Sequence, residues 1–158
     1  MITAVVVTIS DSAHAGLRED KSGPAVVARL EQAGFAVERL VIPDEREISA
    51  ERLRDLADRR VAGAVFTTGG TGITPRDITP EATRDVIEKE IPGFGELMRA
   101  KGLSSTPNAV LSRAVSGTRG GVLIVNLPGS TRGAVESLDA ILGLVPHVLD
   151  LINGRTGH

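Results

Sequence analysis

Hydrophobic residues in this chain form short blocks separated by longer amphipathic stretches. The blocks Ile2–Ile9, Ala62–Thr68 and Val122–Asn126 are nearly continuous and rich in β-branched residues. Such runs are typical of strands that are buried on both faces of a parallel sheet. A further strand is predicted at Phe35–Ile42, and Pro43 ends it.

The stretches between these blocks carry helix signals. One helix opens at Ser22 and ends at Gly34, because the apolar residues between them follow helical spacing. Ser49 is the expected N-cap of a second helix, and Thr79-Pro80-Glu81 combines an N-cap, an early proline and an acidic first turn. Further helices are expected over 94–100, over 108–114 and from the end of the last strand to about 152, whereas 69–78 and 104–108 are predicted loops and 116–121 a turn or hairpin tip.

The alternation of strands and helices predicts an α/β fold. We expect a three-layer arrangement, with a mostly parallel central sheet and helices on both faces. The chain has 158 residues and shows no repeat, linker or low-complexity segment, so a single domain over 1–158 is expected.

Composition and charge exclude several classes of function. The chain has no cysteine, which rules out a disulfide scaffold, a thiolate zinc site and a cysteine nucleophile. Its net charge of −2 and its three aromatic residues, all Phe, disfavour nucleic-acid binding. No apolar stretch is long enough to span a membrane, and the N-terminal residues lack the basic region of a signal peptide. We therefore expect a cytoplasmic protein that binds neither nucleic acid nor membrane.

Ligands of open α/β sheets bind beyond the carboxyl ends of the strands, so the residues that follow each strand carry the chemistry. After the first strand, Thr8–Ser12 and the helix start at Ser22 predict a hydroxyl-rich rim with free N–H groups, or else a solvated loop in which Ser22 caps a helix. After the last strand, Gly129 leads into a helix and gives a second anion-binding start. The alternative there is a plain turn capped by Ser130 or Thr131.

The segment Thr67–Asp77 is a glycine-rich loop at a strand end. Its three glycines allow close backbone approach, so that successive N–H groups converge on a phosphate. The loop matches neither the Walker A pattern nor the GxGxxG dinucleotide fingerprint. Arg76 and Asp77 lie beside it as a candidate phosphate clamp and magnesium ligand.

A second acidic residue, Asp44, follows the second strand directly after Pro43. It should lie at the same sheet edge as Asp77, and two carboxylates over a phosphate site suggest Mg²⁺ held together with nucleotide oxygens. The three histidines form neither a Ser/His/Asp triad nor a metal cluster in the sequence.

The stretch TGGTGITPRDITPEAT, residues 68–83, resembles the signature of the molybdopterin-binding MogA/MoaB family, which the gephyrin G domain shares. The resemblance extends over essentially the whole chain. It also includes TISDS at 8–12, DKSGP at 20–24, IPDE at 42–45, PGFGELMR at 92–99, LSRA at 111–114 and NLPGS at 126–130.

This resemblance implies molybdenum cofactor biosynthesis and a molybdopterin adenylyltransferase activity. Such an enzyme transfers AMP from Mg-ATP, its co-substrate, to the terminal phosphate of molybdopterin and releases pyrophosphate. The family's two essential aspartates match Asp44 and Asp77, which would be the catalytic residues and the Mg²⁺ ligands, with Asp77 the more important. The residues implied to bind molybdopterin and nucleotide are Thr8, Ser10, Asp11, Ser22, Gly69, Gly70, Thr71, Gly72, Ser112, Arg113, Pro128, Gly129 and Ser130.

The family also implies a homotrimer, or a hexamer, and contacts with the proteins of molybdopterin synthesis and molybdenum insertion. Two alternatives stay open. The MoaB branch keeps the fold and the glycine-rich loop, which leaves a non-catalytic molybdopterin-binding carrier as the second interpretation. An assembly module, as the gephyrin G domain is in a larger protein, is the third.

Overall fold

The computed structural model describes residues 1–157 and has one six-stranded sheet in the order β2-β1-β3-β6-β5-β4. The first four strands in this order run parallel, and β5 and β4 are antiparallel additions at one edge. The predicted three-layer, mostly parallel α/β architecture is therefore confirmed. The strands are β1 (Thr3–Ile9), β2 (Ala36–Ile42), β3 (Ala64–Thr68), β4 (Lys89–Glu90), β5 (Ser116–Arg119) and β6 (Val122–Leu127).

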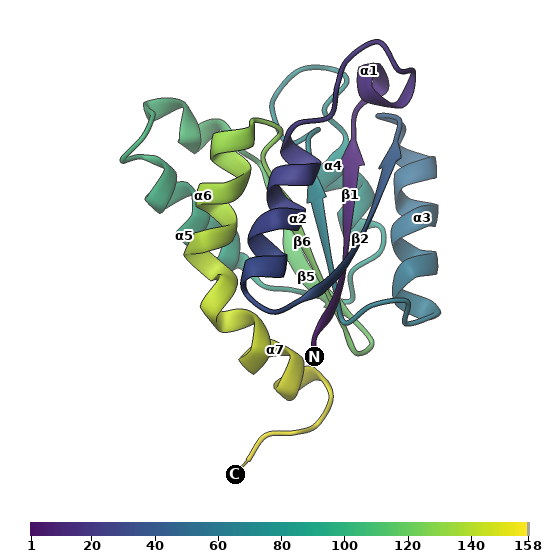
Figure 1. The fold of residues 1–158 in the computed structure, drawn as a ribbon, viewed down its shortest axis with the longest axis vertical. Coiled ribbons are helices and arrows are strands. Elements are labelled where there is room, and N and C mark those ends of the chain that lie inside the picture. The colour runs from purple at the N-terminus through teal and green to yellow at the C-terminus, as the bar shows by residue number, and fades with distance from the viewer. Residues whose placement is uncertain (158) are drawn as a thin grey trace.

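Helices cover both faces of this sheet (Figure 1). On one face lie α2, α5, α6 and α7, and on the other lie α3 and α4. The helices are α1 (Asp11–His14), α2 (Ser22–Gln32), α3 (Arg46–Asp58), α4 (Thr79–Arg84), α5 (Pro92–Gly102), α6 (Thr131–Ile141) and α7 (Val145–Ile152), with 3₁₀ helices η1 (Pro107–Leu111) and η2 (Leu142–Leu144).

Each central strand supplies alternate side chains to two separate cores. In β1, Val6 packs with the helices α2, α5, α6 and α7, whereas Val5 and Val7 pack with α3 and α4. In β3, Phe66 and Val65 divide in the same way. Both faces of these strands are buried, which explains why the sequence shows continuous hydrophobic runs instead of alternation.

One prediction near the end of the sheet is wrong, and one short strand was missed. Residues 116–119 form β5, which pairs with β6, so only Gly120 and Gly121 remain as the hairpin turn. The polar segment Ser116–Arg119 pairs as a strand because it receives backbone hydrogen bonds from a buried neighbour, a tertiary effect that composition does not reveal. The two-residue strand β4 was not expected.

The helix starts also differ from the predictions. Ser49 is not an N-cap, because α3 already begins at Arg46 and the Ser49 side chain is buried within it. Ser22 is the first residue of α2, and its hydroxyl donates to Thr68 Oγ1 rather than capping the helix. Thr79 likewise lies inside α4, and its hydroxyl donates to the carbonyl oxygen of Gly69.

The C-terminal region is not one long helix. It breaks over η2 between α6 and α7, where Pro146 has no N–H to continue the helical hydrogen bonds. The helix expected over 108–114 is the shorter η1. Among residues 1–157, no helix is both long and apolar enough to cross a membrane.

The carboxyl ends of the four parallel strands meet at one edge of the sheet, at the top of Figure 1. The loops after β1 and β3 and the start of α6 gather there. This is the edge at which the sequence predicted the functional residues.

Candidate active site

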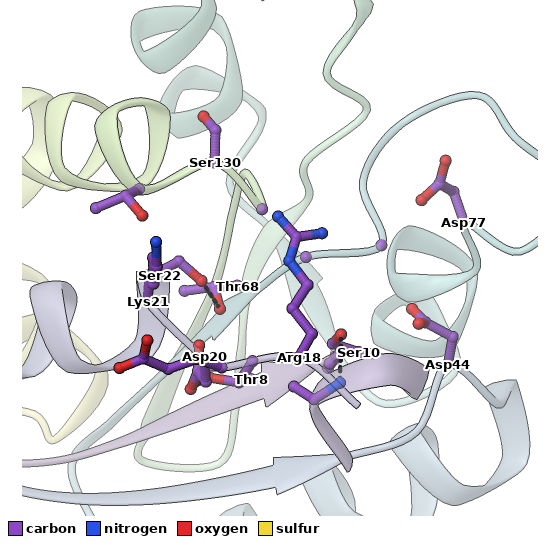
Figure 2. A pocket seen from close by; sticks show the side chains of 17 residues that line it. Thr8, Ser10, Arg18, Asp20, Lys21, Ser22, Asp44, Thr68, Asp77 and Ser130 are labelled. Atoms are coloured by element: carbon purple, nitrogen blue, oxygen red, sulfur yellow. Dashed lines mark hydrogen bonds between the residues drawn. The ribbon is translucent and has the colours of Figure 1, made fainter. Parts of the chain in front are cut away.

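A cavity of about 830 Å³ opens at this edge of the sheet. It lies between the ends of β1 and β3, the N-terminal end of α2 and the N-terminal end of α6 (Figure 2). The structure brings nine of the predicted site residues to its wall: Thr8, Ser10, Ser22, Asp44, Gly69, Gly70, Asp77, Gly129 and Ser130.

Asp44 is fixed by a reciprocal exchange with Asp11 across the ends of β1 and β2. The backbone N–H of Asp11 donates to Asp44 Oδ2 at 2.9 Å, and the N–H of Asp44 donates to Asp11 Oδ1 at 2.9 Å. Burial raises the pKa of the half-buried Asp44 carboxyl, although the N–H of Asp11 acts in the opposite direction. Within residues 1–157, Asp44 Oδ1 accepts no hydrogen bond, so this oxygen is available to a ligand.

Arg76 is already engaged by a carboxylate. Its Nε and Nη2 donate to Asp11 Oδ2 at 3.1 and 2.6 Å. This contact lowers the pKa of Asp11 and raises that of Arg76. Arg76 therefore ties the glycine-rich loop to the Asp11–Asp44 pair, instead of lining the cavity as a phosphate clamp.

Asp77 is held by its own turn. The N–H and the hydroxyl of Thr74 donate to Asp77 Oδ2 at 2.8 and 2.7 Å, and the N–H of Asp77 donates to the carbonyl oxygen of Thr74 at 3.0 Å. A Cβ atom at Gly72 would stand only 2.8 Å from Asp77 Oδ2. Glycine at position 72 therefore leaves room for the carboxylate.

The glycine-rich loop packs backbone against backbone. Gly69 and Gly70 have φ angles of +95° and +69°, in the region that favours glycine. A Cβ atom at Gly69 would overlap the carbonyl oxygen of Ile9, and one at Gly129 would lie 3.2 Å from the Cα of Gly69. Because no side chains intervene, the loops after β1, β3 and β6 approach one another closely around the cavity.

The helix starts and the polar rim are tied together by hydroxyl groups. Thr8 Oγ1 donates to Asp20 Oδ2 at 2.7 Å, and Asp20 Oδ1 accepts from the N–H of Gly23 in the first turn of α2. Ser130 is the N-cap of α6, because its hydroxyl accepts from the N–H of Gly133 at 3.1 Å. Of the two residues considered as a cap in the alternative interpretation, Ser130 and Thr131, the structure has Ser130.

Side chains of both charge signs line the cavity. Figure 2 shows the Asp44 and Asp77 carboxylates at one end, the acidic end, with Lys21 and Asp20 toward the other and Arg18 between them. The Asp20 carboxylate is paired with Arg39. Lys21 was not among the predicted site residues, nor were Asp20, Thr68 and Thr131, which also line the wall. These residues flank predicted ones in the sequence, and that adjacency is the signal by which they could have been found.

Several predicted residues do not line this cavity. Ser112 and Pro128 border a smaller cavity of about 210 Å³ between α5, η1 and α6, which shares Ser130 with the first. Arg113 lies behind the glycine-rich loop. The residues absent from the wall of the larger cavity are Asp11, Thr71, Gly72, Ser112, Arg113 and Pro128.

The donor set at the acidic end fits a magnesium ion shared with a ligand. Among residues 1–157, no group of three or more His, Asp or Glu side chains could hold a metal alone. Asp44 and Asp77 nevertheless both line the cavity. In each carboxylate, one oxygen is held by hydrogen bonds from neighbouring residues of the chain. One or two carboxylates together with substrate phosphates are the usual way in which proteins bind Mg²⁺.

Fold and cavity together define an α/β protein with a polar ligand site at the carboxyl ends of its parallel strands. The family model described as the probable molybdopterin binding domain matches residues 5–147. The chain therefore belongs to the molybdopterin-binding MogA/MoaB family, as its motifs predicted.

Individual relatives agree with this membership. The chain is 42% identical to the molybdopterin adenylyltransferase of Haemophilus influenzae, over 94% of this chain and 83% of the relative. It is 40% identical to the Escherichia coli protein of the same name, over 94% and 84% of the two chains. The crystal structure of the molybdopterin biosynthesis enzyme MoaB from Thermus thermophilus superposes with a TM-score of 0.90 at 45% identity, covering 100% of this chain and 98% of that one.

Proposed function

We propose that this protein is a molybdopterin adenylyltransferase of molybdenum cofactor biosynthesis, with molybdopterin and ATP as substrates. The observation that carries the proposal is the cavity in which two carboxylates, Asp44 and Asp77, face a glycine-rich backbone between two helix starts. The relatives named molybdopterin adenylyltransferase, at 40–42% identity over most of the chain, support the same activity.

The reaction needs no covalent group from the protein. A phosphate oxygen of molybdopterin attacks the α-phosphorus of ATP, the bond to the β-phosphate oxygen breaks, and pyrophosphate leaves with the bonding electron pair. The protein has to place two anionic substrates in line and balance the charge that develops between them. A chain without cysteine is suited to this chemistry.

We assign the acidic end of the cavity to Mg²⁺ and the phosphates of ATP. Asp44 and Asp77 would hold the ion, which neutralises phosphate charge when it is bound. The backbone of Gly69 and Gly70 offers close approach to the phosphates, and Lys21 and Arg18 supply positive charge farther along the wall. The direct contacts that fix Asp44 and Asp77 keep both carboxylates in place before substrate arrives.

The wider setting follows the family. We propose a single molybdopterin-binding domain over 1–158 that assembles as a homotrimer or hexamer in the cytoplasm. We also propose contacts with the proteins that make molybdopterin and insert molybdenum. Analytical ultracentrifugation of the purified protein would test the assembly.

The activity is tested by incubating the purified protein with molybdopterin, Mg²⁺ and ATP, and measuring pyrophosphate and adenylylated molybdopterin. We expect both products in equal amounts, and we expect their loss in the double variant Asp44→Asn/Asp77→Asn. The matched control is Asp55→Asn on α3, where the carboxylate pairs with Arg59 and, among residues 1–157, with no other cation. Tight molybdopterin binding without pyrophosphate release would instead identify the non-catalytic carrier and overturn the proposal.

A further inference from the structure

Arg113 makes four side-chain hydrogen bonds, although it does not itself line the large cavity. Its Nε donates to the carbonyl oxygen of Gly72 at 2.8 Å, and its Nη2 donates to the carbonyl oxygen of Asp77 at 2.9 Å. Its backbone N–H donates to the carbonyl oxygen of Thr71 at 2.8 Å. Three of its contacts therefore hold the glycine-rich loop from behind.

The remaining two bonds go to Glu81. Arg113 Nη1 donates to Glu81 Oε2 at 2.7 Å, and Nη2 donates to Oε1 at 3.2 Å. A bidentate arginine–carboxylate pair of this kind fixes the plane of the guanidinium as well as its position. Hydrogen bonding from Arg113 lowers the pKa of the Glu81 carboxyl, so the pair stays charged at neutral pH. Glu81 lies in the first turn of α4, which anchors the pair to the sheet through the buried Ala82.

The two loop carbonyls that Arg113 holds enclose the turn that carries Asp77. Gly72 precedes this turn and Asp77 ends it, while Thr74 orients the Asp77 carboxylate from within. Thr74 sets the direction of the carboxylate relative to the turn, and Arg113 sets the position of the turn relative to the sheet. Without the Arg113 side chain, the loop would still be held by the backbone N–H of residue 113 on Thr71, by Thr79 on Gly70 and through Arg76, but its Gly72 and Asp77 carbonyls would lose their donors.

We propose that the Arg113–Glu81 ion pair is a positioning device that holds the glycine-rich loop and, through it, the Asp77 carboxylate. This inference rests on the proposed adenylyltransferase function, and it gives Arg113 a role different from the substrate contact that the family resemblance implies. Glu81 becomes a functional residue without touching substrate. Four of the five guanidinium N–H groups of Arg113 donate within the chain, which leaves one Nη1 hydrogen outside these contacts.

Kinetic measurements distinguish a positioning role of Arg113 from direct contact with substrate. We expect Glu81→Gln and Arg113→Gln each to lower kcat by about 10–100-fold, the usual cost of losing a group that orients a metal ligand. Both should raise the Mg²⁺ concentration needed for half-maximal rate, while KM for molybdopterin stays within about twofold of its original value. Because the two residues act as one unit, the double variant should be no slower than either single variant.

The matched control is Asp85→Asn, which removes a similar bidentate partner at the end of α4. Asp85 accepts from Arg46 Nε and Nη2 at 2.8 and 2.9 Å but does not touch the loop. It should leave kcat and the Mg²⁺ requirement unchanged. A higher KM for molybdopterin in Arg113→Gln, with Glu81→Gln behaving like the original protein, would overturn the proposal and return Arg113 to substrate binding.

Amide hydrogen exchange gives a readout that does not depend on activity. In the protein without ligands, Glu81→Gln and the charge-conserving Arg113→Lys should speed exchange in the segment 69–78 and leave β1 and β3 protected. Protected strands show that the variants are folded. If the original protein makes no adenylylated product, the proposed function fails while this measurement still decides the ion pair's role, and unchanged exchange in 69–78 overturns it.

Discussion

The two aspartates of the cavity wall, Asp44 and Asp77, are held in place by different kinds of contact. Asp44 follows the edge strand β2, is half-buried and is held by the backbone of Asp11, 33 residues away in the sequence. Asp77 lies on an exposed loop and is held by Thr74, three residues away. One carboxylate is placed by the pairing of two strands, and the other by a local turn that is fastened from behind.

This difference predicts different effects of the two aspartates on stability and on turnover. The strand register that aligns Ile9 with Ile42 delivers Asp11 and Asp44 to the same place, but it also buries a charge, which raises the pKa of Asp44. The loop holds the Asp77 carboxylate through hydrogen bonds that are exposed to solvent, and precise placement depends on Arg113. We therefore expect substitutions near Asp77 to act on turnover, and substitution of Asp44 to act on stability as well.

The largest expected effect is on Asp77 itself. Asp77→Asn keeps an oxygen for the Thr74 contacts but removes the charge, and we expect turnover to fall by roughly 10²–10³-fold, the size typical of losing one preorganised electrostatic group. Asp44→Asn should cost less, because burial already disfavours its charged form. Pyrophosphate release at saturating ATP and Mg²⁺ measures both. A slower Asp44→Asn enzyme would reverse the assigned order, and near-normal rates in both would remove the aspartates from catalysis.

The sequence predicted that the site lies at the carboxyl ends of the parallel strands and that both aspartates lie there. The hydrophobic runs show where the strands end, and the motif residues come directly after those ends. It could not predict the use of Arg113 and Arg76. Whether an arginine faces a ligand or a carboxylate depends on which elements lie within reach, and Glu81 and Asp11 come close only in the folded chain. Strand β5 was not predicted for the same reason: it is a strand because it pairs with β6, and that contact exists only in the folded chain.

A second prediction concerns the room left for Asp77. Ala at position 72 would place its Cβ 2.8 Å from Asp77 Oδ2, and Gly72 does not have a positive φ, so the backbone accepts the change while the carboxylate has to move. We expect Gly72→Ala to lower kcat by about tenfold, as small displacements of positioned groups do. The melting temperature should change little. The control is Gly93→Ala in α5, where a Cβ meets nothing within 4 Å. Equal rates for the two variants would show that the carboxylate's position is not critical.

The smallest expected effect is on stability, and it belongs to Asp44. Its pKa is raised above the ordinary value of 3.8 mainly by burial, so the folded protein binds this proton more tightly than the unfolded chain does. Stability contributed at this site therefore falls as pH rises through the window that begins near 3.8. Asp44→Asn removes that penalty, and we expect the metal-free variant to melt about 1–2 °C higher at neutral pH.

The difference between Asp44→Asn and the original protein should close as the pH is lowered toward 3.8, where the carboxyl is increasingly protonated in both states. Calorimetry across this range measures it, and Asp55→Asn, which gives up an exposed ion pair with Arg59, should show no gain. A variant less stable than the original protein at neutral pH would mean that the N–H of Asp11 stabilises the Asp44 carboxylate by more than burial costs it. In that case the charged Asp44 carboxylate would not lower the stability of the fold. The two aspartates would then differ only in the geometry of the contacts that hold them.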